Sequence, residues 1–128
     1  MKSATAEWVE KAEGDFATAG RELGAAPAPN FDAACFHAQQ CAEKYLKACL
    51  VEAGRDFPKT HDLSALLQLL LPGGPALATL GTDLDWLTDV GIEVRYPGAA
   101  ADAADAGRAV GIAARTRDYA RRFLTLPP

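Results

Sequence analysis

The sequence has little of what builds sheets and nothing that resembles a membrane segment. Only 8% of its 128 residues are aromatic, and β-branched residues, which also favour pleated surfaces, are sparse. No apolar stretch approaches the roughly 18 residues that a membrane helix requires. Residues 1–10 contain no apolar run of the kind found in signal peptides. We therefore expect a cytoplasmic protein that has neither strands nor a membrane span.

Cysteine and histidine are also scarce. The three cysteines, Cys35, Cys41 and Cys49, fall on one predicted helix, where their spacing keeps the side chains apart. This spacing argues against intrachain disulfides and indicates a reducing compartment. The sequence has two histidines, no Cys-x-x-Cys or His-Glu-x-x-His motif and no glycine-rich phosphate loop. We expect no metal ion and no cofactor.

Positive charge is in the minority. The chain has 13 Lys and Arg against 17 Asp and Glu, a formal net charge of -4. An acidic balance argues against a broad surface that coats nucleic acid, although it permits a local basic pocket.

Strong helix formers, by contrast, dominate between the turns. Ala, Leu, Glu, Lys and Arg are frequent, and Gly and Pro gather at residues 24–29, 72–75 and 97–98, which divide the chain into helix-length pieces. We predict an all-α fold, an up-and-down bundle of four long helices plus one short helix. A chain of this length suits a single domain, residues 1–128, with its core at about 5–124. The predicted helices span about residues 5–23, 30–54, 60–70, 76–94 and 101–124.

Apolar periodicity and capping residues support these helices. Asn30 suits an N-cap, Gly54 a left-handed C-terminal cap, and Thr60 the start of the short helix. The second helix has an inward stripe of mostly small residues that would let a neighbouring helix approach closely. The residues expected in the core are Trp8, Ala12, Phe16, Ala19 and Leu23; Phe31, Ala34, Cys35, Ala38, Cys41, Ala42, Tyr45 and Cys49; Leu63, Leu66, Leu67 and Leu70; Leu77, Leu80, Leu84, Leu87, Gly91 and Val94; and Ala103, Ala106, Val110, Ala113, Ala120 and Leu124.

The second helix also has a polar stripe. His37, Gln40, Lys44 and Lys47 share one face, and Glu43 lies beside them, four residues before Lys47. One interpretation is a solvated face whose charges support the helix. The other is the lining of a site for an anionic ligand. The His and Gln in the stripe favour the second interpretation, as does Phe36, which lies near the stripe with no core position to occupy.

Three further groups allow two interpretations each. His61, beside Thr60 at a helix start, is either structural or part of a phosphate site with Lys59. Arg95 either caps the preceding helix or binds a phosphate while Tyr96 stacks on a base. The third group, spaced by seven residues, forms either a salt-bridged face, which is the stronger interpretation, or a stripe that tracks RNA. Its members are Arg108, Arg115 and Arg122.

Four segments together resemble the HEPN domain family. Residues 36–48, Phe-His-Ala-Gln-Gln-Cys-Ala-Glu-Lys-Tyr-Leu-Lys-Ala, are similar to its Gln-Gln…Glu-Lys…Leu-Lys helix. The Thr-His-Asp-Leu segment at 60–63, Arg-Tyr-Pro at 95–97 and an opening helix with Trp8, Ala12 and Asp15 follow the same pattern. The resemblance covers about residues 7–124, and the order and spacing of the segments make it more specific than any one motif.

The resemblance implies a helical bundle that forms a homodimer and is often encoded beside a minimal nucleotidyltransferase. Members are proposed to bind nucleotides or RNA, and many are metal-independent endoribonucleases or toxins. The ribonuclease branch has an Arg followed, after four to six residues, by a His. Arg95 fits the first position, but the three possible positions of the His are occupied by Ala100, Ala101 and Asp102. An ordinary Asp titrates near 4 and makes a poor base at neutral pH, so we expect binding rather than catalysis.

Two functional hypotheses follow. In the first, a non-catalytic homodimer binds a nucleotide or RNA and docks a nucleotidyltransferase in a toxin–antitoxin-like pair. Its binding residues would be Arg95, Tyr96, Lys44, Lys47, His37, Gln40 and Glu43. In the second, a divergent endoribonuclease uses Arg95 on the transition-state phosphate, with His61 or Asp102 as the candidate base and His37 as a further substitute. A purely structural adaptor that dimerises through its small-residue face and Phe36 is a third possibility.

Overall fold

Helices make up the whole regular structure of the part of the chain that can be described. The computed structural model describes residues 1–72 and 75–128, and it contains no strand within them. Five α-helices and one 3-10 helix follow one another: α1 (Ser3–Gly24), α2 (Phe31–Glu52), α3 (Leu63–Leu70), η1 (Pro75–Leu80, the 3-10 helix), α4 (Gly81–Glu93) and α5 (Ala103–Phe123). The predicted all-α fold is confirmed.

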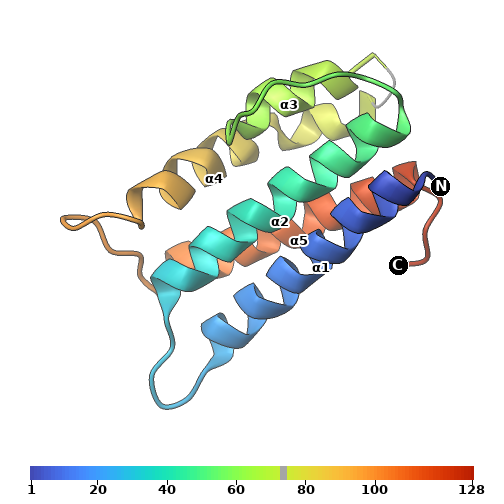
Figure 1. Ribbon diagram of the computed structural model, residues 1–128. Helices are drawn as coiled ribbons and strands as arrows, with labels where there is room; N and C mark the ends of the chain where they lie inside the picture. Colours follow the sequence, from blue (N-terminus) through green and yellow to red (C-terminus); the bar gives the residue numbers. More distant parts are fainter. Residues whose placement is uncertain (73–74) are drawn as a thin grey trace.

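The four longer helices alternate in direction around α2. In Figure 1, α1 and α4 run one way, whereas α2 and α5 run the other. After α2, residues 53–62 return along the bundle, so that α3 starts beside the first half of α2 (Figure 1). A hydrogen bond from the Gln39 side chain to the His61 carbonyl, 3.1 Å, fixes this return. The loop before α5 contacts the first turn of α2, where the Ala101 amide donates to Asp32 at 2.8 Å.

Helix α2 is the centre of the core. Asn30 caps its start by accepting from the Ala33 amide at 3.0 Å, and Gly54 follows its end with a φ of +69°, as the sequence predicts. Its small residues face the other helices, and small side chains allow backbones to approach closely. The residues of the small-residue stripe that are fully buried are Ala34, Cys35, Ala38, Cys41, Ala42 and Cys49, and Tyr45 is buried with them.

The core stripes of the outer helices match the prediction less evenly. In α1, Ala12 and Ala19 are buried, whereas the large aromatic members of the stripe are half-buried. In α5, Ala103 is exposed, contrary to prediction; it is the first residue of the helix. The inward face of α5 instead includes Ala109, Ile112 and Thr116, which are buried.

Two predicted helix boundaries differ from the structure. Thr60 does not cap α3; Asp62 does, by accepting from the amides of Ser64 and Ala65 at 3.0 and 3.4 Å. Thr60 accepts from the Asp62 amide one step earlier. The helix predicted over 76–94 is divided, because residues 75–80 adopt 3-10 geometry before α4 begins.

The expected apolar face of α4 is otherwise present. Leu80, Leu84, Leu87 and Gly91 are buried. The Leu77 side chain and residues 73–74 lie outside the described part of the structure. No helix within the described residues is long and apolar enough to span a membrane.

Candidate functional site

The turn between α4 and α5 presents one arginine and one tyrosine. The α4 helix ends at Glu93, and the Arg95 and Tyr96 amides continue the turn by donating to carbonyls of the last helical residues. The Arg95 guanidinium carbon lies 4.7 Å from the centroid of the Phe36 ring on α2. Within residues 1–72 and 75–128, this guanidinium makes neither an ion pair nor a hydrogen bond. Tyr96 is 62% exposed.

Phe36 links this turn to the polar stripe of α2. Its ring stacks on the His37 ring with a centroid distance of 5.2 Å and an interplanar angle of 16°. His37 Nδ1 lies 2.8 Å from Asp15 Oδ1, and Lys44 Nζ lies 2.5 Å from Asp15 Oδ2. Asp15 is a buried residue of α1, so this end of the stripe packs against α1 instead of facing solvent freely.

The other end of the stripe is a buried polar cluster. Glu43 is 4% exposed and Lys47 8%, and Lys47 Nζ lies 3.1 Å from Glu43 Oε2. His61 Nδ1 lies 2.7 Å from Glu43 Oε1, and Gln39 Nε2 donates to the same oxygen at 3.3 Å. Gln40 in turn donates to Gln39 at 2.8 Å. The solvated-face interpretation therefore fails for Glu43 and Lys47, because residues 53–62 cover them.

Aromatic rings complete this cluster. Lys47 Nζ lies 5.6 Å from the Trp8 ring centroid and 5.8 Å from that of Phe57, and the two rings meet edge to face. A lysine held between a carboxylate and two ring faces is stabilised as a cation. This arrangement ties α1, α2 and the returning segment 53–62 together, which is an architectural role.

Asp102, a candidate base in the sequence, caps α5. Its carboxylate accepts from the Asp105 amide at 2.8 Å, and the Asp105 carboxylate accepts from the Asp102 amide at 3.1 Å. This reciprocal pair is a capping box. The Asp102 side chain therefore acts as the N-cap of α5.

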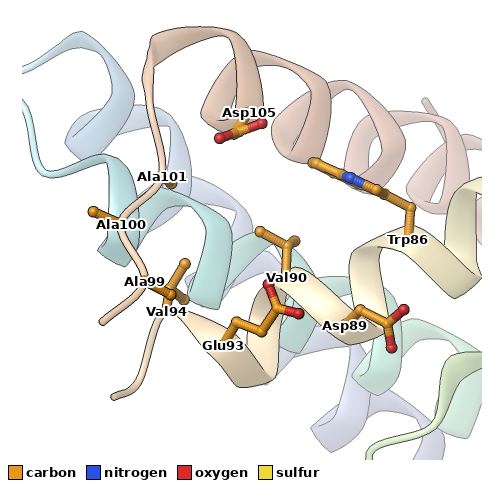
Figure 2. Close-up of a pocket in the computed structure, with 9 residues that line it drawn as sticks. All are labelled: Trp86, Asp89, Val90, Glu93, Val94, Ala99, Ala100, Ala101 and Asp105. Atoms are coloured by element: carbon orange, nitrogen blue, oxygen red, sulfur yellow. The ribbon is translucent and has the colours of Figure 1, made fainter. Parts of the chain in front are cut away.

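A groove lies between α4 and the start of α5, next to the Arg95 turn. It has a volume of about 330 Å³ and is lined by Trp86, Asp89, Val90, Glu93, Val94, Ala99, Ala100, Ala101 and Asp105. Figure 2 shows the Asp105 and Glu93 carboxylates on two sides of the hollow. Ala100 and Ala101 occupy two of the three positions at which the ribonuclease branch of the family that the sequence resembles can have its histidine. In this chain the groove has both apolar and acidic lining residues and no basic one.

The arginines spaced by seven on α5 contact their own chain. Arg115 lies 2.6 Å and Arg108 3.7 Å from Asp83 of α4, and the Arg108 guanidinium carbon lies 4.1 Å from the Trp86 ring centroid. Arg122 lies over Tyr119. These contacts fit the salt-bridged face that the sequence favours over a stripe tracking RNA.

A second network, which sequence reasoning missed, joins α1, α2 and α5. Arg117 makes a two-pronged contact with Glu13, at 2.7 and 2.8 Å. The Tyr45 hydroxyl donates to Glu13 at 2.6 Å and accepts from Arg121 at 3.0 Å. The Arg117 hydrogen bonds lower the pKa of Glu13, and burial raises the pKa of Tyr45. The available signal was a tyrosine in a core stripe, because a buried hydroxyl needs a polar partner.

The cysteines of α2 are buried thiols. All three are free. Burial raises the pKa of Cys35 to about 11 and that of Cys49 to about 12, and burial also raises the pKa of Cys41. Thiols that remain protonated at neutral pH are poor nucleophiles and poor metal ligands. Within residues 1–72 and 75–128, no three His, Cys, Asp or Glu side chains gather as a metal site.

The structure thus brings together some of the predicted site residues and separates others. Arg95 and His37 contact the same phenyl ring, that of Phe36. His61 is held by Glu43, and Asp102 by the start of α5. Two residues were not predicted as site residues. Asp15 contacts both His37 and Lys44, and Gln39 joins α2 to the His61 carbonyl.

Comparisons with known proteins agree with this fold. The chain matches the family model described as the HEPN domain over residues 5–123. Among the solved structures, it is similar to the crystal structure of TT1696 from Thermus thermophilus, with a TM-score of 0.83 and 22% identity, covering 95% of this chain and 99% of that one. At that identity the likeness shows the fold alone. None of the proteins with curated descriptions matches the chain. Because the family model spans nearly the entire chain, the protein belongs to the HEPN domain family.

Proposed function

We propose that this HEPN protein binds a nucleotide or an RNA end, with Arg95 on a phosphate and Tyr96 stacked on a base. The observation that carries the proposal is the Arg95 guanidinium, which rests on the Phe36 ring at 4.7 Å with no carboxylate partner among the described residues. A cation–π contact orients a guanidinium without neutralising it. Its planar donors then suit two phosphate oxygens, and an exposed tyrosine ring suits a base.

The surroundings favour binding without catalysis. The two alanines at 100–101 cannot transfer a proton, and the Asp102 carboxylate caps α5. The acidic rim of the neighbouring groove repels a phosphate chain. A mononucleotide or a strand end therefore fits the turn better than a long RNA that crosses the groove.

The other candidate residues have supporting roles in this proposal. Lys44 and His37 share Asp15, and Lys47 and Glu43 pair inside the protein. They position α2, and with it Phe36, beneath Arg95. Gln40 extends the same hydrogen-bonded network through Gln39.

A divergent endoribonuclease is the second candidate, and His37 is the observation in its favour. If Nδ1 of His37 donates to Asp15, Nε2 has a free lone pair, which is the state of an oriented general base. In this candidate, Nε2 accepts the proton of a 2′-hydroxyl while Arg95 stabilises the phosphate. His37 would then take the place that the sequence-based hypothesis gave to His61 or Asp102.

One pair of assays separates the two candidates. Purified protein is titrated with a fluorescent nucleotide and incubated with a labelled RNA in EDTA, as wild type, Arg95→Ala, His37→Gln and the control Arg122→Ala. The binding proposal predicts that Arg95→Ala weakens binding about tenfold or more, that Arg122→Ala changes it little, and that no variant cleaves RNA. Cleavage that is lost in both Arg95→Ala and His37→Gln would establish the nuclease instead. An absence of both binding and cleavage would leave a structural adaptor, but not one that dimerises through the small-residue face of α2, because that face is buried within the chain.

We further propose a homodimer that acts with a minimal nucleotidyltransferase in a toxin–antitoxin-like pair. This part rests on the family resemblance, since homodimers and such partners are what the resemblance implies. Light scattering of the purified chain tests the dimer, and co-purification with a nucleotidyltransferase encoded by the adjacent gene tests the partner. A monomer at micromolar concentration contradicts the proposed dimer. The absence of such a complex contradicts the proposed partner.

A further inference from the structure

The groove beside the Arg95 turn has an apolar floor. Trp86, Val90 and Val94 of α4 and the following turn are half-buried, and residues 99–101 line the groove with them. Figure 2 shows Val90 between the Trp86 ring and the Val94 side chain along one side of the hollow. Six of the nine lining residues are apolar, so the groove offers contact area to the carbon stem of a side chain.

The charged residues that line the groove are all acidic. Asp89 and Glu93 are exposed, and neither makes an ion pair within the described residues. Asp105 uses one oxygen in the capping box and has no basic partner in that same part of the chain. Asp83, earlier on α4, contrasts with them because it faces both Arg115 and Arg108. Within the described residues, Asp83 is therefore neutralised by Arg115 and Arg108, whereas the three carboxylates of the groove have no basic partner.

The chain itself shows how this wall holds a cation. The Arg108 guanidinium lies 4.1 Å from the Trp86 ring centroid and 3.7 Å from Asp83. An aromatic ring together with a carboxylate is a favourable environment for a guanidinium. The groove has the same two kinds of group, because the Trp86 ring and the Asp105 carboxylate both line it (Figure 2).

We propose that this groove docks an arginine- or lysine-bearing segment of a partner protein. The long basic side chain would lay its carbon stem on the apolar floor and place its cationic head among the Asp89, Glu93 and Asp105 carboxylates. The volume of about 330 Å³ lies at the lower end of ligand pockets, which suits one inserted side chain and its flanking backbone. Like charge disfavours nucleic acid here, so the groove and the Arg95 turn are adjoining surfaces for ligands of opposite charge.

The test uses two synthetic peptides and the indole N–H resonances of the full-length protein. One peptide has two arginines among glycines, and the other has neutral citrulline in their place. The Trp86 resonance is assigned with Trp86→Phe, and Trp8, which lies outside the groove, is the internal reference. We expect the arginine peptide to shift the Trp86 resonance, with an affinity that falls as salt is added, and the citrulline peptide to leave it unchanged.

Charge-matched variants make the test specific to the groove. Asp89→Asn/Glu93→Gln removes two rim charges, whereas Glu10→Gln/Asp118→Asn removes two charges elsewhere. We expect the first pair to weaken peptide binding about fivefold or more and the second pair to change it by less than about twofold. Equal weakening by both pairs would indicate diffuse attraction and overturn the proposal, as would the absence of a Trp86 shift. If free arginine amide binds as tightly as the peptide, the occupant is a small cation. If an RNA oligomer shifts the Trp86 resonance, the occupant is nucleic acid. Either result overturns the proposal that a partner protein docks here.

Discussion

Gly91 of α4 faces the Gln39 side chain of α2 so closely that a Cβ at position 91 would lie 2.7 Å from both Gln39 Cβ and Cγ. Gln39 Cβ is fixed to the α2 backbone, so a rotamer change cannot remove the closest contact. The contact also lies beside the hydrogen bonds that join Gln39 to Glu43 and to the His61 carbonyl. The α2–α4 spacing is therefore set by the absence of a side chain at Gly91.

Replacing this glycine should destabilise the bundle. Gly91→Ala is expected to lower the free energy of unfolding by about 1–3 kcal/mol, the usual cost of overpacking, in urea titrations followed by circular dichroism. Gly111→Ala in α5 is the control, because nothing lies within 4 Å of an added Cβ there. That control should stabilise the protein by up to about 1 kcal/mol. A neutral Gly91→Ala would mean that α2 and α4 can separate freely.

The buried Glu43–Lys47 pair should show strong non-additivity. Glu43→Leu leaves the Lys47 ammonium without its carboxylate in a buried site, and the expected loss is about 3 kcal/mol. The double variant Glu43→Leu/Lys47→Met removes both charges and should recover most of that loss. A urea-based double-mutant cycle measures the coupling. His61→Ala is the comparison, since the exposed imidazole should contribute less than about 1 kcal/mol; additive losses would contradict a coupled buried pair.

Acid should weaken the protein through Glu13. Its pKa in the folded state is lowered, chiefly by the Arg117 hydrogen bonds, relative to about 4.3 in the unfolded chain. The unfolded state therefore binds the proton first, and stability from this group is present above about pH 4.3 and lost as pH falls through the lower folded value. Glu13→Gln should lower stability at pH 7 by about 1–2 kcal/mol, discounted for partial solvent exposure.

The same variant should flatten the acid limb of the stability curve. Unfolding free energies measured by urea titration between about pH 3 and pH 7 test this slope. Glu10→Gln is the control, because Glu10 is an exposed residue of the same helix. An acid limb that is as steep in Glu13→Gln as in the wild type would assign the effect to other carboxylates.

The two roles considered for Asp102 can be separated by substitution. Asp102→Ala removes the N-cap of α5 and should cost about 1 kcal/mol of stability, whereas Asp102→Asn keeps an accepting oxygen and should cost only a few tenths. Neither change should alter nucleotide affinity, because the cap does not contact the Arg95 guanidinium. Thermal unfolding and nucleotide titration of both variants check this. A loss of binding in Asp102→Asn at unchanged stability would restore Asp102 as a site residue.

The sequence by itself determined the helices and the face that α2 turns to the core. Gly54 ends the second helix with a positive φ, Asn30 starts it, and the stripe from Ala34 to Cys49 is buried. These features are local: caps, breakers and a 3.6-residue period act within one helix. Two neighbouring residues before α3, Thr60 and Asp62, can both act as a cap. Thr60 was predicted, but Asp62 accepts the helical amides.

Only the tertiary structure decided which partner each charged side chain takes. His37 and Lys44 have the periodicity of an open polar face, yet both contact Asp15 of another helix, and Lys47 is buried because residues 53–62 return across it. Arg95 meets Phe36, which is far away in the sequence. Ion pairs and ring contacts depend on how helices are placed relative to one another, and helical periodicity contains no information about that placement. The acidic groove beside Arg95 arises for the same reason, because α4 and the start of α5 supply its carboxylates separately.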